Sequence, residues 1–318
     1  MKSWRYYGTG KPLQLDEVPE PHPGPGEVVI KVAAVGICHS DVSAQYEPSW
    51  GARLSVVPQT FGHENAGTII SVGEGGTGWA KGDRVGMVPV LSSGESLGYE
   101  KWAGAFGPQM RVPVEALVRL PDEVPFDLGA MGTDAGLTAY HGMVTRGGAT
   151  AGRRVGVIGI GGLGYMGARI AVLLGAEVYA AEINPDARAL ADEIGLSGVA
   201  ESITAFADKD LELIVDYAGF GTTTAEAIQT LGDKGVLVQV GLGRLEATID
   251  TYAVMDKELS VRGSKSGTKE DLGALYELLR GGQFAPPITH VTPAEIPAAV
   301  NRLRDGGVVG RIVAMYED

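Results

Sequence analysis

From about residue 150 the chain alternates short apolar segments with helix-like segments, and this alternation limits the possible folds more than any other feature of the sequence. We expect strands at 153–160, 177–183, 211–219, 234–242 and 258–264, and helices at 162–175, 185–195 and 222–232. Apolar strands that alternate with helices of this length form a parallel sheet with helices on both faces. The sequence therefore predicts an α/β fold with a doubly wound parallel sheet here.

The regions before and after this alternating segment have a different residue pattern. Residues 1 to about 130 are β-rich and irregular, with Val/Ile runs at 26–36, 66–73 and 82–90 that Gly, Pro and Asp interrupt. We expect two helices and then a strand at 310–316 at the end of the chain. The capping box Thr292-Pro293-Ala294-Glu295 marks the N-terminus of one of these helices. We expect this strand to return to the N-terminal region, which gives domain boundaries of 1–135, 136–267 and 268–318.

Composition excludes several classes of protein. The 318 residues suffice for two domains, and 44% hydrophobic with 20% charged residues describes a soluble globular protein. A net charge of −13 argues against nucleic acid or an anionic membrane as partner. The sequence shows no signal peptide, membrane-spanning run or internal repeat. The single cysteine, Cys38, precludes an intramolecular disulfide and predicts a reducing, cytoplasmic location.

A glycine-rich turn predicts a dinucleotide site. The motif GxGxxG lies between an expected strand and an expected helix. Its residues are Gly159, Ile160, Gly161, Gly162, Leu163 and Gly164. Such glycines let the chain turn sharply and let a pyrophosphate approach the helix N-terminus. Glu182 follows the next strand, where a carboxylate accepts hydrogen bonds from both adenine-ribose hydroxyls and repels a 2′-phosphate, which favours NAD over NADP. Alternatively, Glu182 only caps the helix that begins at Asn184-Pro185.

Three residues of the N-terminal region are candidate metal ligands. Cys38 and His63 each follow a strand-like segment beside glycines. Taken singly, each can be interpreted as an ordinary core residue, a buried thiol and a packed histidine. Together, a thiol and an imidazole in such positions are typical of a metal site. A catalytic zinc uses three protein ligands and one open position. Asp134 is the only acid in the small-residue stretch 128–143. It is either the third ligand or the N-cap of a helix that follows it.

Several motifs together resemble one family. GICHSD, GHENAG, GDRV, the glycine turn, AEINPDA and GRIV occur in the order found in zinc-dependent alcohol dehydrogenases of the medium-chain dehydrogenase/reductase superfamily. The resemblance covers essentially the whole chain. It implies a GroES-like catalytic domain (1–135 and 268–318), a Rossmann NAD-binding domain (136–267), and zinc in the cleft between them.

The resemblance also implies roles for individual residues. Cys38 and His63 match the first two zinc ligands, and Asp134 falls where the family usually has cysteine, although some members carry aspartate in the same TDAGLT context. Thiolate and carboxylate both carry −1, so this exchange leaves the ligand charge on zinc unchanged. Glu64 is implied to approach zinc when water is exchanged, and Asp41 to orient the His63 ring.

Further positions match with the cofactor or the proton path. Ser40 corresponds to the hydroxyl that takes the alcohol proton, and His39 and Arg311 to side chains near the pyrophosphate. Thr138 falls near the nicotinamide. The remaining histidines match no ligand position and are expected to be ordinary surface or packing residues: His22, His141 and His290.

The chain departs from the family pattern at two places. Many relatives bind a second, structural zinc through four closely spaced cysteines, but the segment Val88–Met110 is shorter and has none. We therefore expect one catalytic zinc per subunit and no structural zinc. The second departure is Ser43, which occupies the position of the histidine that often ends the proton relay.

The expected activity is reversible hydride transfer between a primary or secondary alcohol and NAD, giving an aldehyde or ketone. The family implies a homodimer or homotetramer that acts on a small-molecule substrate. One alternative is a zinc-free quinone or enoyl reductase of the same superfamily, and another is a non-catalytic nucleotide-binding protein.

Overall fold

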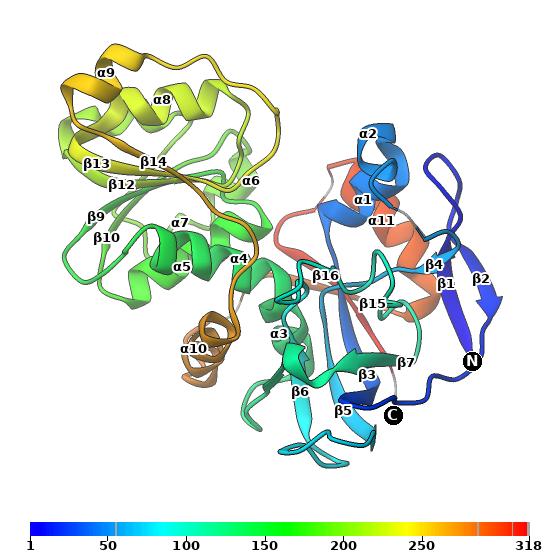
Figure 1. The fold of residues 1–318 in the computed structure, drawn as a ribbon. Coiled ribbons are helices and arrows are strands. Elements are labelled where there is room, and N and C mark those ends of the chain that lie inside the picture. Colours follow the sequence, from blue (N-terminus) through cyan, green and yellow to red (C-terminus); the bar gives the residue numbers. More distant parts are fainter. Residues whose placement is uncertain (55, 285, 307, 317–318) are drawn as a thin grey trace. The chain divides into compact units, whose positions relative to one another are not determined.

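The computed structural model describes residues 1–54, 56–284, 286–306 and 308–316 (Figure 1). The chain divides into two compact units: unit 1 comprises residues 1–135 and 268–318, and unit 2 comprises residues 136–267. Among the described residues, none of the helices combines the length and the apolar character that crossing a membrane requires.

Unit 1 is built on two sheets. The larger has the order β15-β16-β3-β5-β6-β8, with β7 also paired to β3, and the smaller has the order β2-β1-β4. The strands are β1 (Lys2–Tyr6), β2 (Gln14–Glu17), β3 (Glu27–Ile37), β4 (Gln59–Thr60), β5 (Asn65–Val72), β6 (Arg84–Met87), β7 (Gln109–Pro113), β8 (Leu117–Arg119), β15 (Ile288–Val291) and β16 (Arg311–Met315). The C-terminal strand β16 pairs antiparallel with β3, as the sequence predicts for a returning strand.

Short helices connect these strands. They are α1 (His39–Tyr46), α2 (Pro48–Gly51), α3 (Phe126–Met131), α10 (Lys269–Arg280) and α11 (Ile296–Arg304), with 3₁₀ turns η1 (Val114–Ala116) and η5 (Pro293–Glu295) and the π-helical turn η2 (Gly132–Gly136). The predicted capping box is present: Thr292 and Glu295 bond reciprocally at the start of η5, which leads into α11.

Unit 2 contains one parallel sheet of six strands in the order β11-β10-β9-β12-β13-β14. Numbered along the chain, this order is 3-2-1-4-5-6, which is the doubly wound arrangement of dinucleotide-binding folds. The strands are β9 (Arg154–Ile158), β10 (Glu177–Ala181), β11 (Gly198–Ala200), β12 (Leu211–Asp216), β13 (Leu231–Gln239) and β14 (Ser260–Gly263). The predicted fold class is confirmed.

Helices cover both faces of this sheet, with α5 and α8 on opposite faces (Figure 1). The helices of unit 2 are α4 (Leu137–Tyr140), α5 (Gly162–Leu173), α6 (Pro185–Arg188), α7 (Ala191–Ile194), α8 (Thr222–Thr230) and α9 (Thr251–Asp256), with η3 (His141–Arg146) and η4 (Ile203–Lys209). Between α8, η4 and the strands lies a core of buried side chains that includes Ile158, Phe206, Ile214, Ile228 and Leu237.

Several elements of unit 2 differ from the sequence prediction, and α9 and η4 were not predicted. The helix expected at 185–195 is split into α6 and α7, because the chain makes a tighter turn at Leu190, whose N–H bonds to Ala187 O. The edge strand β11 was not predicted, since its three residues are too few to produce a periodic apolar pattern.

Candidate functional site

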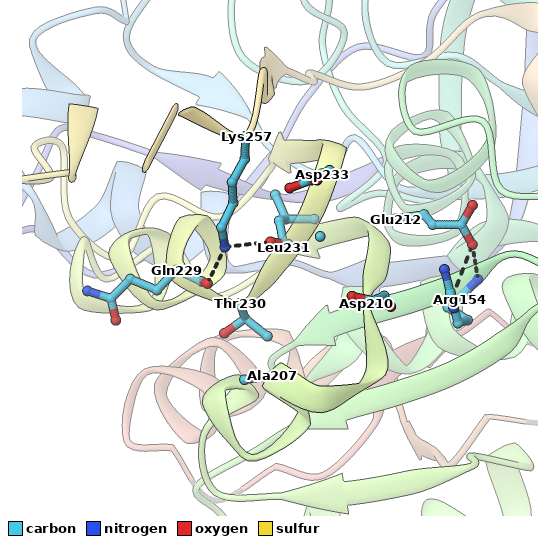
Figure 2. A pocket seen from close by; sticks show the side chains of 10 residues that line it. Arg154, Ala207, Asp210, Glu212, Gln229, Thr230, Leu231, Asp233 and Lys257 are labelled. Atoms are coloured by element: carbon cyan, nitrogen blue, oxygen red, sulfur yellow. Dashed lines mark hydrogen bonds and ion pairs between the residues drawn. The ribbon is translucent and has the colours of Figure 1, made fainter. Parts of the chain in front are cut away.

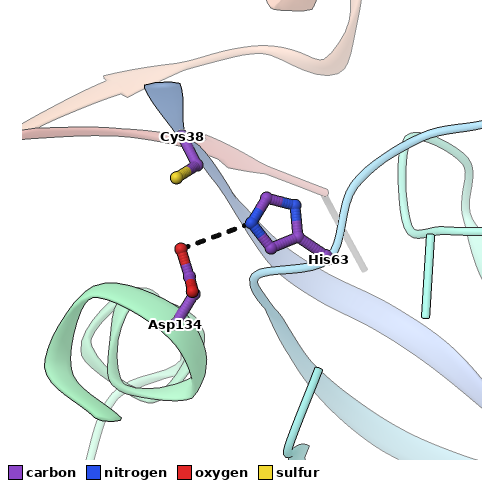
Figure 3. A group of neighbouring side chains, drawn as sticks. All are labelled: Cys38, His63 and Asp134. Atoms are coloured by element: carbon purple, nitrogen blue, oxygen red, sulfur yellow. Dashed lines mark hydrogen bonds and ion pairs between the residues drawn. The ribbon is translucent and has the colours of Figure 1, made fainter. Parts of the chain in front are cut away.

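The side chains of Cys38, His63 and Asp134 point toward one another in unit 1 (Figure 3). One ligand atom of each lies within 4.8 Å of the others, and the Nε2 atom of His63 is 3.3 Å from the Oδ2 atom of Asp134. Nitrogen and oxygen ligands about 2.0–2.2 Å from a tetrahedral zinc lie about 3.3–3.6 Å from each other. The donor atoms and their spacing therefore match a tetrahedral zinc site.

Strand pairing brings the first two of these residues together. Cys38 follows β3, and His63 precedes β5. The two strands are antiparallel, with Val35 opposite Asn65, so the end of β3 lies beside the beginning of β5. The proximity of Cys38 and His63 is therefore a direct consequence of sheet register.

Asp134 lies inside the π-helical turn η2, which follows α3 directly. It does not cap a helix, because the N-cap residue of α4 is Gly136 and no side chain caps that helix. The capping alternative considered from sequence is therefore wrong. An extra residue in a π turn re-aims the neighbouring side chains, and such turns occur often at functional sites.

The charges and hydrogen bonds of the three residues shift one another's pKa values. Burial lowers the pKa of His63, but the carboxylates of Asp41 and Asp134 outweigh this effect and raise the pKa well above its ordinary value. Burial raises the pKa of Asp134, but the charge and hydrogen bond of His63 lower it by more, so that the pKa is about 2. Burial and the nearby Asp134 charge raise the pKa of the Cys38 thiol. Binding of a divalent cation would displace the protons of His63 and Cys38, because both side chains must be deprotonated to act as ligands.

Glu64 and Arg311 form a buried ion pair beside the three residues. The Arg311 guanidinium donates to Glu64 Oε2, and both side chains are almost completely buried. Glu64 Oε1 has no hydrogen-bond partner. The pair fits because Gly36 has no side chain: a Cβ there would lie 2.4 Å from the Glu64 carboxyl carbon. Burial raises the pKa of Glu64, and the charge of Arg311 opposes this rise.

The structure also identifies a residue that the sequence analysis missed. The Tyr99 hydroxyl is 2.8 Å from His63 Nδ1 and donates to Asp41 Oδ1 at 3.0 Å. Asp41 itself, which was expected to orient His63, is 3.5 Å from the same nitrogen. No local pattern distinguishes Tyr99 from the ten other tyrosines of the chain.

The residues expected on the proton path lie on α1. Ser40 Oγ is 3.7 Å from Cys38 Sγ, and Ser40 is half-buried. His39 is exposed. The Ser43 hydroxyl donates to Glu47 on the surface. Thr138, expected near the nicotinamide, lies in α4 of unit 2 and is half-buried.

The glycine turn of unit 2 has the geometry that the motif predicts. Gly159 follows β9 with φ +82°, and Gly161 is the N-cap residue of α5, whose first residues are Gly162, Leu163 and Gly164. A Cβ at Gly164 would lie 1.7 Å from Gly159 O, so only glycine allows this approach. A Cβ at Gly161 would meet nothing within 4 Å, which leaves open space where a pyrophosphate would contact the helix N-terminus.

Glu182 lies one residue beyond β10 and faces the same turn. Its Oε2 atom accepts from Ile160 N at 2.6 Å, and its Oε1 atom accepts from Asn184 N at 2.8 Å. The following helix α6 has its own cap, because the Asn184 side chain accepts from Asp186 N. Capping of α6 is therefore not the only role open to Glu182.

A separate open pocket of about 400 Å³ lies at the amino ends of the strands of this sheet (Figure 2). Arg154 and Leu231, which begin β9 and β13, line it, and Lys257 donates to the Gln229 and Leu231 carbonyls there. Ligands of doubly wound sheets bind at the carboxyl ends of the strands. This pocket is at the amino ends, so it is distinct from the glycine turn.

Comparisons with known proteins cover both units. Residues 24–122 match the family model described as alcohol dehydrogenase GroES-like domain, and residues 162–281 match the one described as zinc-binding dehydrogenase. An alcohol dehydrogenase of Rhizobium meliloti (strain 1021) is 32% identical over 328 residues, covering 96% of this chain and 95% of that protein. An alcohol dehydrogenase of Moraxella sp. (strain TAE123) is 29% identical, with 99% of each chain covered.

Solved structures show the same fold. The alcohol dehydrogenase from the hyperthermophilic archaeon Aeropyrum pernix has a TM-score of 0.90 and 27% identity, covering 99% of this chain and 100% of that chain. The acetophenone reductase from Geotrichum candidum, solved in complex with NAD, has a TM-score of 0.87 and 26% identity, covering 99% and 97%. The family models and the relatives agree with the site geometry, and the chain belongs to the zinc-binding alcohol dehydrogenases of the medium-chain dehydrogenase/reductase superfamily.

Proposed function

We propose that this protein is an alcohol dehydrogenase that holds one catalytic zinc on Cys38, His63 and Asp134 and transfers a hydride between an alcohol and NAD. The observation that carries the proposal is the convergence of these three side chains, from separate elements of unit 1, at the spacing of a tetrahedral site. Unit 1 is the proposed catalytic domain, and unit 2 is the proposed nucleotide-binding domain.

When bound, zinc supplies a Lewis acid that lowers the pKa of an alcohol hydroxyl or polarises a carbonyl, and NAD supplies the hydride acceptor. Three protein ligands leave a fourth position for the substrate oxygen. Ser40 is the proposed first proton acceptor, because its hydroxyl lies next to the Cys38 thiol at the edge of the site. The hydroxyl of the half-buried Ser43 donates to Glu47, so water is the proposed end of the relay.

Glu64 and Arg311 have a proposed supporting role. Arg311 is buried against Glu64, so we assign it to holding this carboxylate rather than to the pyrophosphate expected from sequence. The unpartnered Glu64 Oε1 atom is available for the ligand exchange that the family resemblance implies. His39, which is exposed next to the site, stays the proposed side chain near the pyrophosphate.

The proposed nucleotide is NAD. The backbone amides at the start of α5 receive the pyrophosphate, with the open space at Gly161 allowing its approach. The Glu182 carboxylate already accepts two backbone hydrogen bonds at the end of β10, and its remaining lone pairs are available to the ribose hydroxyls. Its negative charge would repel the 2′-phosphate of NADP.

The two alternatives are weaker. A zinc-free quinone or enoyl reductase gives no reason for a thiol, an imidazole and a carboxylate to meet at ligand spacing. A non-catalytic nucleotide-binding protein leaves the buried Glu64–Arg311 pair and the adjacent Ser40 hydroxyl without a purpose.

We also propose a homo-oligomer in the cytoplasm without structural zinc. The edge strand β14 ends the sheet of unit 2 and exposes Val261, so another copy can pair there. The segment 88–110 has no cysteine, and Cys38, the only one in the chain, belongs to the catalytic site.

The test is alcohol oxidation, followed through NADH absorbance, by zinc-loaded protein and by protein treated with a chelator. We expect activity with primary or secondary alcohols, loss of that activity with the zinc, and recovery when zinc is returned. Full activity in protein shown by elemental analysis to be free of metal would refute the catalytic zinc. Absence of alcohol oxidation in the zinc-loaded protein would refute the dehydrogenase activity and favour the zinc-free reductase.

A further inference from the structure

The segment between β6 and β7 packs a tyrosine against the proposed zinc site. Tyr99 is only 6% exposed, and its ring centroid lies 4.7 Å from that of His63 and 5.2 Å from that of Phe61. Gly98 makes this approach possible, because it has φ +83° and a Cβ there would lie 2.9 Å from Gly62 O. The backbone of the segment is thus fixed next to His63.

The Tyr99 hydroxyl is the direct hydrogen-bond partner of His63 Nδ1. It lies 2.8 Å from this nitrogen, whereas Asp41 Oδ1 lies 3.5 Å away, beyond a good N–H···O bond. Since His63 Nε2 faces Asp134, it is the nitrogen that must offer its lone pair to a metal. Nδ1 must then carry the proton and donate it, and the phenol oxygen is placed to accept.

The Tyr99 hydroxyl also donates to Asp41, whose carboxylate accepts from the backbone of the ligand Cys38. Tyr99 donates to Asp41 Oδ1 at 3.0 Å, and Asp41 Oδ2 accepts from the backbone N–H of Cys38 at 3.0 Å. A chain of hydrogen bonds therefore joins His63 to Cys38 through Tyr99 and Asp41. All four residues are buried, so these bonds act in an environment with little water.

We propose that Tyr99 is a positioning residue for the zinc ligand His63. Its hydroxyl fixes the tautomer and ring orientation of His63 and couples both to Asp41, so that Cys38 and His63 are held in place before the metal binds. The segment from which family members with a structural zinc build their cysteine lobe supports the catalytic zinc in this chain. This inference rests on the zinc site proposed above.

The test is the Tyr99→Phe variant, which removes the hydroxyl and keeps the ring contacts. We expect its affinity for Co²⁺, measured by competition with a chromophoric chelator, to fall about tenfold or more. The visible ligand-field bands of the bound Co²⁺ should also shift, because the His63 ring is no longer held at Nδ1. A role in folding alone would leave these bands unchanged.

The matched control is Tyr316→Phe. The Tyr316 hydroxyl donates to Ala105 O at 3.2 Å, so it anchors the same segment without touching His63. We expect this control to keep the cobalt affinity and spectrum of the wild type. Equal losses in both variants would overturn the proposal, because general loosening of the segment would then explain them.

Two further outcomes separate this inference from the proposed function. If the wild type binds cobalt and Tyr99→Phe binds it equally well with the same spectrum, only the role of Tyr99 is wrong. If the wild type binds neither cobalt nor zinc, both the proposed metal site and the proposed role of Tyr99 are wrong.

Should Tyr99→Phe fail to fold, the cobalt-loaded wild type provides a second test. We expect its proton NMR spectrum in water to contain a hyperfine-shifted, slowly exchanging Nδ1 proton of His63. Rapid exchange of that proton with solvent would contradict a buried bond to Tyr99.

Discussion

The Nε2 atom of His63 lies 3.3 Å from the Oδ2 atom of Asp134, although 71 positions separate the two residues in the sequence. Asp134 offers a carboxylate where the family resemblance implies a thiolate. Both groups are anionic, so the charge that a bound zinc meets is the same, and the carboxylate oxygen lies slightly closer to the metal than sulfur does.

Asp134→Asn should therefore lose zinc. The amide keeps the size of the side chain but removes the anionic ligand, so we expect zinc per subunit and activity to fall together while the fold is kept. Asp134→Cys should retain part of the metal. Plasma emission spectrometry and a thermal melt of each variant measure both effects. The control is Asp127→Asn, which removes the carboxylate from the His290–Asp127 pair outside the site; full zinc and activity in Asp134→Asn would contradict the ligand role.

The metal-free protein should be most stable in a window of mildly acidic pH. The pKa of Asp134 is lowered to about 2, so its contribution, roughly 2 kcal/mol, is present above pH 3.8 and is lost as the pH falls through about 2. The pKa of His63 is raised, so its contribution is complete below pH 6.5 and is lost as the pH rises through the folded-state pKa. Melting temperatures of chelator-treated protein across pH should show this window, and Asp134→Asn should flatten its acidic side.

Ser40→Ala should reduce kcat by about 100-fold or more, the usual scale of a lost proton-transfer step. Zinc content and NAD binding should be unchanged, because Ser40 is not among the three ligand-bearing residues. Ser43→Ala is the matched variant, and it should have little effect because the Ser43 hydroxyl is directed to Glu47 on the surface. Steady-state kinetics decide between them, and equal losses would show that the relay begins elsewhere.

Glu182→Gln should narrow the preference for NAD over NADP. The amide oxygen can keep one of the two backbone bonds, to Ile160 N or Asn184 N, but the charge that repels a 2′-phosphate is gone. The ratio of kcat/KM for the two nucleotides measures the change. Glu212→Gln, at the opposite edge of the sheet, should leave the ratio as it is. A wild type that prefers NADP would show that the role assigned to Glu182 is wrong.

Arg311→Met should destabilise the protein by about 3–5 kcal/mol, because it leaves the Glu64 carboxylate buried without its partner. The double variant Glu64→Gln/Arg311→Met removes both charges and should recover most of that loss. Urea unfolding of the zinc-free proteins gives the free energies of unfolding. If instead the stability is unchanged and only the KM for NAD rises, Arg311 acts on the cofactor, as the sequence comparison with the family first implied.

The sequence by itself determined the features that depend on local pattern. Apolar segments alternating with helices predicted the doubly wound sheet of unit 2, because periodicity reflects which face of each element is buried. The glycine turn at 159–164 was predictable for the same reason: its requirement for glycine is set by contacts within a few residues, such as Gly164 against Gly159 O. Cys38 and His63 were recognisable as a pair of metal-ligand types beside strand ends.

Only the tertiary structure decided the rest of the site. The segment around Asp134 alone favoured helix capping, and only the family resemblance implied a zinc ligand, because the π turn in which it lies was not predicted from the local sequence. Tyr99 and Arg311 reach their partners across 36 and 247 positions, and such contacts depend on how the segment between β6 and β7 and the strand β16 pack in unit 1. A side chain's ligand type can be read from the sequence, but its hydrogen-bond partners are chosen by packing between segments that no local pattern relates.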